Sequence, residues 1–129
     1  MSTQTHYTIK RAADEIRTGW AVFNLKDIRV SLVFIARDQA EQERDIMERG
    51  VLEMKFRSWF RLGRVRFNES NLYRGKVVAQ GRRHVMIYAG KGQLHLLELY
   101  LLLIAEIKPV QGQPLMCELN KGRLQRLQA

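Results

Sequence analysis

The sequence has one cysteine, two prolines and no apolar run long enough to cross a membrane. With Cys117 alone, the 129-residue chain cannot form an internal disulfide, which is typical of a protein kept in a reducing compartment. The longest apolar run, Leu99 to Ala105, is far shorter than the roughly 20 residues of a membrane-spanning helix. The first residues contain no apolar stretch typical of a secretory signal. We therefore expect a cytoplasmic protein without a membrane partner.

The centre of the sequence has almost no acidic residues. Residues 55–92 contain ten basic residues and one acid, Glu69, whereas the rest of the chain contains 12 basic and 12 acidic residues. The formal net charge of +9 therefore originates in this one segment. Seven of its ten basic residues are arginine, whose guanidinium group suits bidentate contact with phosphate. A basic segment in an otherwise neutral chain indicates a surface for a polyanion.

No group of residues predicts catalysis, a metal site or a cofactor site. The histidines, His6, His84 and His95, do not pair with Cys117 or with one another at metal-ligand spacing. The segment "AGKGQ" does not fit the phosphate-binding loop pattern. Val85 stands where the pattern requires its first glycine, and Gly92 stands where it requires serine or threonine. The acidic residues that occur close together lie in segments where basic residues offset their negative charge. We expect a protein that is not an enzyme and that binds neither a metal nor a cofactor.

Two helices are predicted in the first 50 residues. The segment "YTIKRAADEIRTG" places Ile9, Ala12 and Ile16 on one helical face and ends at a glycine, which predicts an N-terminal helix. Two strands follow around the turn-like "NLKD", and the second, residues 28–35, is apolar enough to be central in a sheet. The segment "DQAEQERDIMERG", residues 38–50, predicts one helix between strands.

From residue 51 to residue 107 the sequence predicts strands separated by glycine-containing turns. Residues 94–107 fit either a strand or a buried helix, and periodicity does not separate the two. Residues 120–129 are predicted to be a frayed basic tail. We expect a single domain over residues 1–129, with a helix–strand half (1–50) and a basic, β-rich half (51–107). The predicted fold class is α+β, with a small, curved, mostly antiparallel sheet. A partly open, OB-like barrel fits this description.

The segment "KFRSWFRLGRVRF", residues 55–67, alternates basic and apolar side chains. As two strands joined by a turn, it places Phe56 and Phe60 on a core face and Trp59 among the arginines of an outer face. Like charges side by side on a sheet repel, so folding does not account for this outer face. Charge with an exposed ring is a common way to hold single-stranded nucleic acid. The candidate contact residues are Lys55, Arg57, Trp59, Arg61, Arg64, Arg66, Tyr73, Arg74, Lys76, Arg82, Arg83 and Lys91.

The segment from Gly75 to Leu99 contains an apolar strand, a polar loop, a second apolar strand, and a Gly-x-Gly turn leading to alternating leucines. In this order it resembles the C-terminal, OB-like domain of methionyl-tRNA formyltransferases, over about a fifth of the chain. The resemblance implies a barrel and contact with tRNA through a basic surface. The contact residues that it implies are Lys76, Arg82, Arg83 and Lys91. After Leu99 the sequence departs from the family, and the catalytic domain has no counterpart here, so no formyl transfer is implied.

Two functions fit these observations. The first is a small, non-catalytic nucleic-acid-binding protein that takes RNA or single-stranded DNA on a basic sheet face. The alternative is a protein-interaction subunit or inhibitor that docks a basic face on an acidic partner. In the alternative, "LELYLLLIAEI", residues 97–107, would supply a homo-oligomer interface, and an exposed apolar patch there would favour it.

Overall fold

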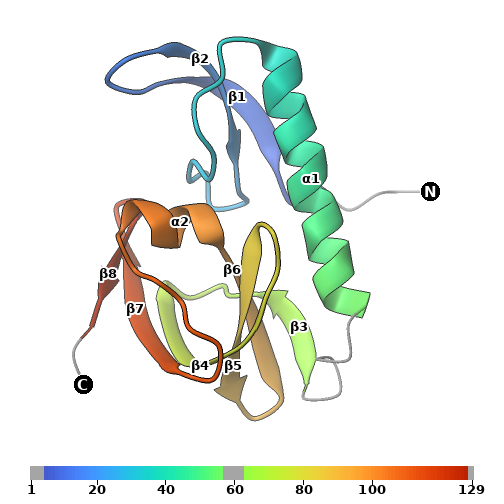
Figure 1. The fold of residues 1–129 in the computed structure, drawn as a ribbon, viewed down its shortest axis with the longest axis vertical. Coiled ribbons are helices and arrows are strands. Elements are labelled where there is room, and N and C mark those ends of the chain that lie inside the picture. The colour runs from blue at the N-terminus through green and yellow to red at the C-terminus, as the bar shows by residue number, and fades with distance from the viewer. Residues whose placement is uncertain (1–4, 57–62, 128–129) are drawn as a thin grey trace. The chain divides into compact units, whose positions relative to one another are not determined.

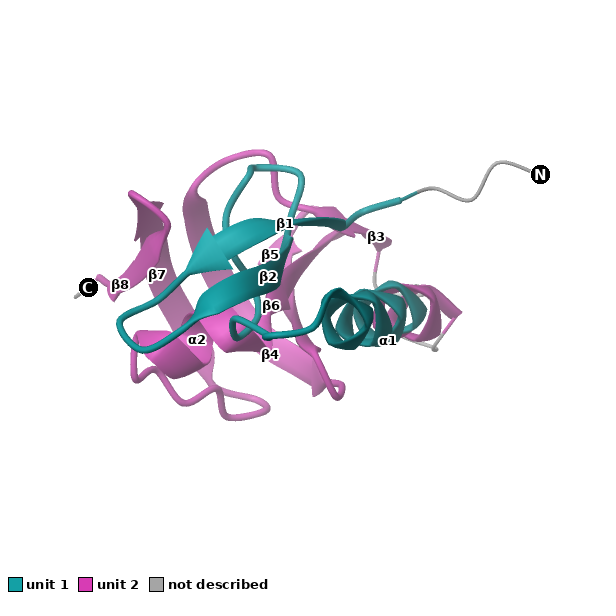
Figure 2. Ribbon diagram, turned by 90° about the horizontal axis from the view of Figure 1, so that it is seen from above, with its two compact units in different colours: residues 1–49 teal, residues 50–129 magenta. Residues whose placement is uncertain are grey.

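The computed structural model describes residues 5–56 and 63–127. The described elements follow in the order β1, β2, α1, β3, β4, β5, β6, α2, β7 and β8, so the fold is α+β as predicted (Figure 1). The chain divides into two compact units, Met1–Arg49 and Gly50–Ala129, which Figure 2 colours separately. Neither helix in the described part of the chain combines the length and the apolar character needed to cross a membrane.

The first unit begins with a β-hairpin, so the predicted N-terminal helix is wrong. β1 (Thr8–Ala13) pairs antiparallel with β2 (Thr18–Phe23). In the turn, the carboxylate of Asp14 accepts backbone N–H bonds from Ile16 and Arg17 at 2.9 and 2.8 Å. Ile16, predicted to lie in an apolar helical stripe, is 80% exposed. The pairing with β2 and the Asp14 turn satisfy backbone groups that a helix would otherwise satisfy within itself.

Residues 28–35 do not form the predicted central strand. They pair with β2 at two isolated bridges, Trp20 with Phe34 and Phe23 with Arg29. Between these bridges the Ser31 hydroxyl accepts the backbone N–H of Val22 at 2.9 Å, in place of a strand carbonyl. A side chain that bonds the neighbouring backbone in this way competes with the regular ladder. The polar Ser31 thus interrupts a segment that its apolar neighbours predict to be a strand.

The helix between strands is present and is longer than predicted. α1 (Arg37–Phe56) continues past Gly50, so the prediction that residues 51–56 begin a strand is wrong. Met47, Val51 and Met54 are buried at helical spacing, which extends one buried stripe to the last turn. A Cβ on Gly50 would lie 3.2 Å from His84 Nδ1, so this residue brings the helix close to the side chain of His84. Gly50 therefore permits a close approach and does not end the helix.

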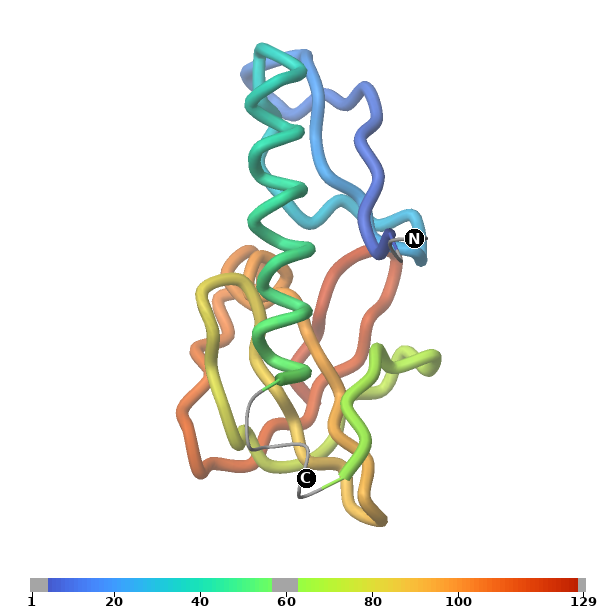
Figure 3. Tube along the Cα trace, turned by 90° about the vertical axis from the view of Figure 1, so that its right-hand side faces the viewer, coloured from blue at the N-terminus to red at the C-terminus, as the bar shows by residue number. Residues whose placement is uncertain are grey.

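The second unit is built on a six-stranded sheet in the order β3-β6-β5-β4-β7-β8. The strands are β3 (Arg64–Phe67), β4 (Leu72–Gln80), β5 (His84–Gly90), β6 (Gln93–Glu98), β7 (Pro114–Asn120) and β8 (Arg123–Arg126). β3 pairs parallel with β6, and the other neighbouring pairs are antiparallel. Figure 3 shows the course of the chain through these strands. Over the described residues the sheet is mixed and open, with β3 and β8 at its edges. It is mostly antiparallel, as expected, and it is not closed into a barrel.

Two further segments of the second unit, residues 94–107 and 120–127, contain regular secondary structure. Residues 94–107 are strand first and helix second, because β6 ends at Glu98 and α2 (Leu99–Ile104) begins directly after it. Residues 120–129, expected to be a frayed tail, contain β8, which pairs with β7. Leu119 and Leu124 lie opposite each other in that pair and are both buried. Burial of these two leucines holds β8 to the sheet.

Candidate nucleic-acid interface

The predicted basic residues occupy several elements rather than one strand pair. Three of the candidates, Arg57, Trp59 and Arg61, lie outside the described residues, so the structure does not test whether they contact nucleic acid. Lys55 lies in the last turn of α1 and not on a strand. The positions of the remaining basic candidates, on β3, on β4 and in two turns, follow from the sheet register.

Arg64 and Arg66 project from the edge strand β3, close to the turn between β5 and β6. Both side chains are exposed, while Val65 between them is partly buried. The backbone N–H of Arg64 donates to the carbonyl of Gly92 at 2.7 Å, and Arg66 bonds the side chain of Gln93. Lys91 is exposed in the same turn. Three cations of the central segment thus come from positions that converge on one end of the sheet.

His95 lies opposite Arg66 in the parallel pair and is partly buried. Burial lowers the pKa of His95, and the neighbouring Arg66 guanidinium lowers it further. Both effects favour the neutral imidazole. The positive charge at this edge therefore comes from the arginines and not from the histidine.

Arg74 and Lys76 lie on the other side of the sheet from Arg66. Residues that pair directly across neighbouring strands share a face. Arg66 pairs with His95, His95 with Ile87, and Ile87 with Val77. Lys76 is adjacent to Val77 and so points to the opposite face. The β3 and β4 cations therefore fall on opposite faces of the sheet and do not share a single basic face.

Arg82 and Arg83 form a third group, in the turn between β4 and β5. Arg82 is exposed and Arg83 is partly exposed. The turn is closed by a bond from the backbone N–H of Gly81 to the carbonyl of His84 at 2.7 Å. The carbonyl of Arg83 also accepts the N–H of Leu99, where α2 begins, at 2.9 Å. The backbone of this turn is therefore held from both sides.

Tyr73, predicted to stack on bases, is not available for that role. Its side chain is only 4% exposed and lies opposite Cys117, which is fully buried. Burial raises the pKa of Tyr73, with further contributions from Glu98 and Cys117. The prediction fails because Tyr73 falls on the core side of β4. Arg74, the next residue, falls on the outer side.

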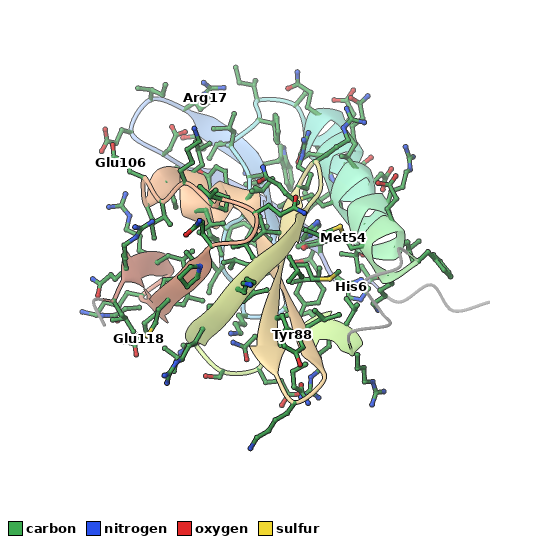
Figure 4. All side chains as sticks on the ribbon, turned by 60° about the horizontal axis from the view of Figure 1, so that its bottom comes forward. His6, Arg17, Met54, Tyr88, Glu106 and Glu118 are labelled. Atoms are coloured by element: carbon green, nitrogen blue, oxygen red, sulfur yellow. The ribbon has the colours of Figure 1, made fainter. Side chains whose placement is uncertain are left out.

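Tyr88 is the aromatic residue that the sequence prediction missed. It lies on β5 directly opposite Lys76 and is partly exposed (Figure 4). The segment around it, "HVMIYAG", is apolar almost throughout and gives no period-2 signal for an outer face. Its register opposite a lysine could be known only from the paired strands.

The apolar run that could have supplied an interface is mostly interior. Leu101, Leu102 and Ile107 are buried, while Leu103 is 73% exposed. This divides the run between core and surface. Leu103 alone is not the contiguous apolar patch that the homo-oligomer prediction requires.

Charge is divided unequally between the two units. Residues 1–49 contain eight basic and eight acidic residues, whereas residues 50–129 contain 14 basic and five acidic residues. The whole net charge of +9 therefore belongs to the second unit. Four ion pairs lie in the first unit: His6–Glu48, Lys10–Asp27, Arg37–Glu41 and Arg44–Asp45. None of these pairs involves Arg64, Lys76 or Arg82 of the second unit.

Within residues 5–56 and 63–127, no group of three or more histidine, cysteine or carboxylate side chains is arranged to hold a metal ion. Comparisons with protein-family models, with curated protein sequences and with solved structures found no match.

Proposed function

We propose that this protein is a small, non-catalytic nucleic-acid-binding protein whose second unit carries the binding surface. The observation that supports the proposal most strongly is the location of the net charge, +9 in the second unit against zero in the first. Exposed arginines and lysines that lack carboxylate partners are available to phosphates. Binding then gains free energy from the release of counterions.

The positions of these cations favour a ligand that follows the surface over a distance. Arg64 and Arg66 lie on one face, Lys76 lies on the other, and Arg82 lies in a turn at the far end of β5. An extended chain of phosphates can reach such separated charges, whereas a small anion reaches one group at a time. RNA or single-stranded DNA fits this requirement.

The first test is a fluorescence-anisotropy titration with a short single-stranded RNA, the same sequence as DNA, a DNA duplex and an acidic polypeptide. We expect the single-stranded nucleic acids to bind most tightly and to remain bound at near-physiological salt. Equal binding of every polyanion, including the polypeptide, would contradict the proposal. Preferential binding of the acidic polypeptide would support the alternative, a basic face that docks on an acidic protein.

Two variants of equal net charge sharpen this test. Arg64→Gln with Arg82→Gln removes two exposed cations of the second unit, and Arg17→Gln with Arg44→Gln removes one exposed and one partly exposed cation of the first. We expect the second-unit variant to weaken nucleic-acid binding by roughly three- to tenfold and the first-unit variant to change it little. If both variants lose the same affinity, binding follows total charge and not a surface of the second unit.

A further inference from the structure

The outer face of β4 and β5 places one aromatic ring beside two cations. Lys76 of β4 lies directly opposite Tyr88 of β5, so the two side chains leave the sheet on the same face. Arg74 is two residues before Lys76 on β4 and shares that face, opposite Met116 of β7. We call Arg74, Lys76 and Tyr88 the β4–β5 platform.

Gly75 allows the two strands of the platform to approach each other closely. A Cβ at this position would lie 2.1 Å from the backbone carbonyl oxygen of Tyr88, which no side chain can tolerate. The glycine thus brings the backbone of Tyr88 against β4, between Arg74 and Lys76. The ring and the two cations are therefore positioned by strand pairing and not by a loop.

The platform carries positive charge, and its ring is partly exposed. Arg74 and Lys76 are exposed, and neither has an ion pair with a described carboxylate. Around them on the same face lie Met116, partly exposed, and Pro114, exposed opposite Lys76. Glu118 of β7, opposite Leu72, limits the basic part of this face on one side.

We propose that the β4–β5 platform binds single-stranded nucleic acid by stacking a base on Tyr88 while Arg74 and Lys76 contact the flanking phosphates. Base stacking needs an accessible ring on a rigid support, and phosphate contact needs cations beside it. Paired bases of a duplex do not expose a face to such a ring, so the platform selects single strands. The inference rests on the proposed function and specifies which surface acts and how.

The test compares Tyr88→Leu, Tyr88→Ala and Tyr88→Phe on single strands of about 12 nucleotides, as oligo(U), oligo(dT) and an abasic DNA strand. We expect Tyr88→Leu and Tyr88→Ala to weaken binding of oligo(U) and oligo(dT) by roughly 5- to 150-fold, and Tyr88→Phe to change it by less than about threefold. On the abasic strand, where no base can stack, the Tyr88 variants and the original protein are expected to bind alike. The oligo(U) and oligo(dT) arms show which of RNA and DNA is the preferred ligand.

Two controls separate a structural effect from a loss of stacking. Tyr88→Leu keeps an apolar side chain at the site, and its urea unfolding midpoint shows whether the fold is intact. Tyr100→Leu makes the same change at a partly exposed tyrosine on α2 and should leave binding unchanged. Arg74→Gln with Lys76→Gln should weaken binding of the base-bearing and abasic strands by the same factor.

The outcomes distinguish this inference from the proposed function. If the original protein binds oligo(U) or oligo(dT) and a folded Tyr88→Leu variant binds equally well, the platform is overturned and the proposed function stands. The proposal is also overturned if Tyr88→Leu weakens binding of the abasic strand as much as it weakens binding of the base-bearing strands. If the original protein binds none of the strands, the proposed function fails and the platform fails with it.

Discussion

Cys117 and Tyr73 face each other across β7 and β4 in the interior of the second unit. Burial raises the pKa of the Cys117 thiol from 9.0 to about 11, although the Arg126 guanidinium acts in the opposite direction. Because the thiolate is the reactive form, the folded protein holds this sulfur in an unreactive state. The raised pKa stabilises the fold below pH 9.0, and this contribution is lost as the pH rises toward 11.

We expect Cys117 to react slowly with a disulfide reagent such as DTNB at about pH 8, and rapidly in concentrated guanidinium chloride. Absorbance of the released thiolate measures both rates. A Cys117→Ala variant gives the baseline, because the sequence has no other cysteine. Immediate and complete reaction of the native protein would show that the side chain is accessible.

Glycine substitutions within β4, at Gly75, and directly after it, at Gly81, should differ in cost. In Gly75→Ala the new methyl group would lie 2.1 Å from the Tyr88 carbonyl oxygen, so a backbone must move and strand hydrogen bonds must lengthen. In Gly81→Ala the nearest atom is the Met54 sulfur at 3.3 Å, at the end of a flexible side chain. We expect a loss of about 2 kcal/mol or more in the free energy of unfolding for Gly75→Ala, and under about 1 kcal/mol for Gly81→Ala. Urea denaturation followed by circular dichroism measures both, and equal losses would contradict the close approach.

At the scale of elements, β8 joins residues 123–126 to the sheet. It pairs with β7 over Arg123–Arg126, and its only buried side chain is Leu124, which is 4% exposed. The flanking side chains Arg123 and Gln125 are exposed. A strand with one buried side chain is held at that residue.

We therefore expect Leu124→Ala to lower the free energy of unfolding by about 2 kcal/mol or more, because the lost apolar burial leaves a cavity beside Leu119. Gln125→Ala, the adjacent exposed position on the same strand, should change it by less than about 0.5 kcal/mol. Chemical denaturation of the two variants measures the difference. Equal, small effects would show that residues 123–126 are frayed, as the sequence predicts.

At the scale of the whole molecule, charge separates one neutral unit from one strongly basic unit. For nucleic acids, the logarithm of the binding constant falls linearly with the logarithm of the salt concentration, in proportion to the number of phosphates neutralised. If five cations of the second unit contact phosphates of a single strand, the slope is about −3.5. Removing two of them should make the slope smaller in magnitude by about 1.4.

This prediction is measured by repeating the anisotropy titration over a range of salt concentrations. Arg64→Gln with Arg82→Gln should reduce the slope, while Arg17→Gln with Arg44→Gln should leave it unchanged. The two variants have the same net charge, so a difference between them reflects location and not total charge. A slope near zero for the original protein would mean that phosphate contacts do not drive binding.

The sequence by itself determined the α+β class, the helix that begins near residue 38 and the location of the net charge. These properties follow from composition and from periodicity over long segments, which do not depend on what a segment packs against. It also identified exposed cations, such as Arg64 and Lys76, because charged side chains stay in solvent wherever the backbone places them.

Tertiary structure alone decided which faces the side chains share. The apolar residues of "YTIKRAADEIRTG" fit a helix, and pairing with β2 made the segment a hairpin. A difference of one position on β4 buries Tyr73 and exposes Arg74, while the register between β4 and β5 sets Tyr88 beside Lys76. Strand side chains alternate with a period of two, so a shift of one residue exchanges core and surface. That register depends on long-range pairing, which a local pattern does not encode.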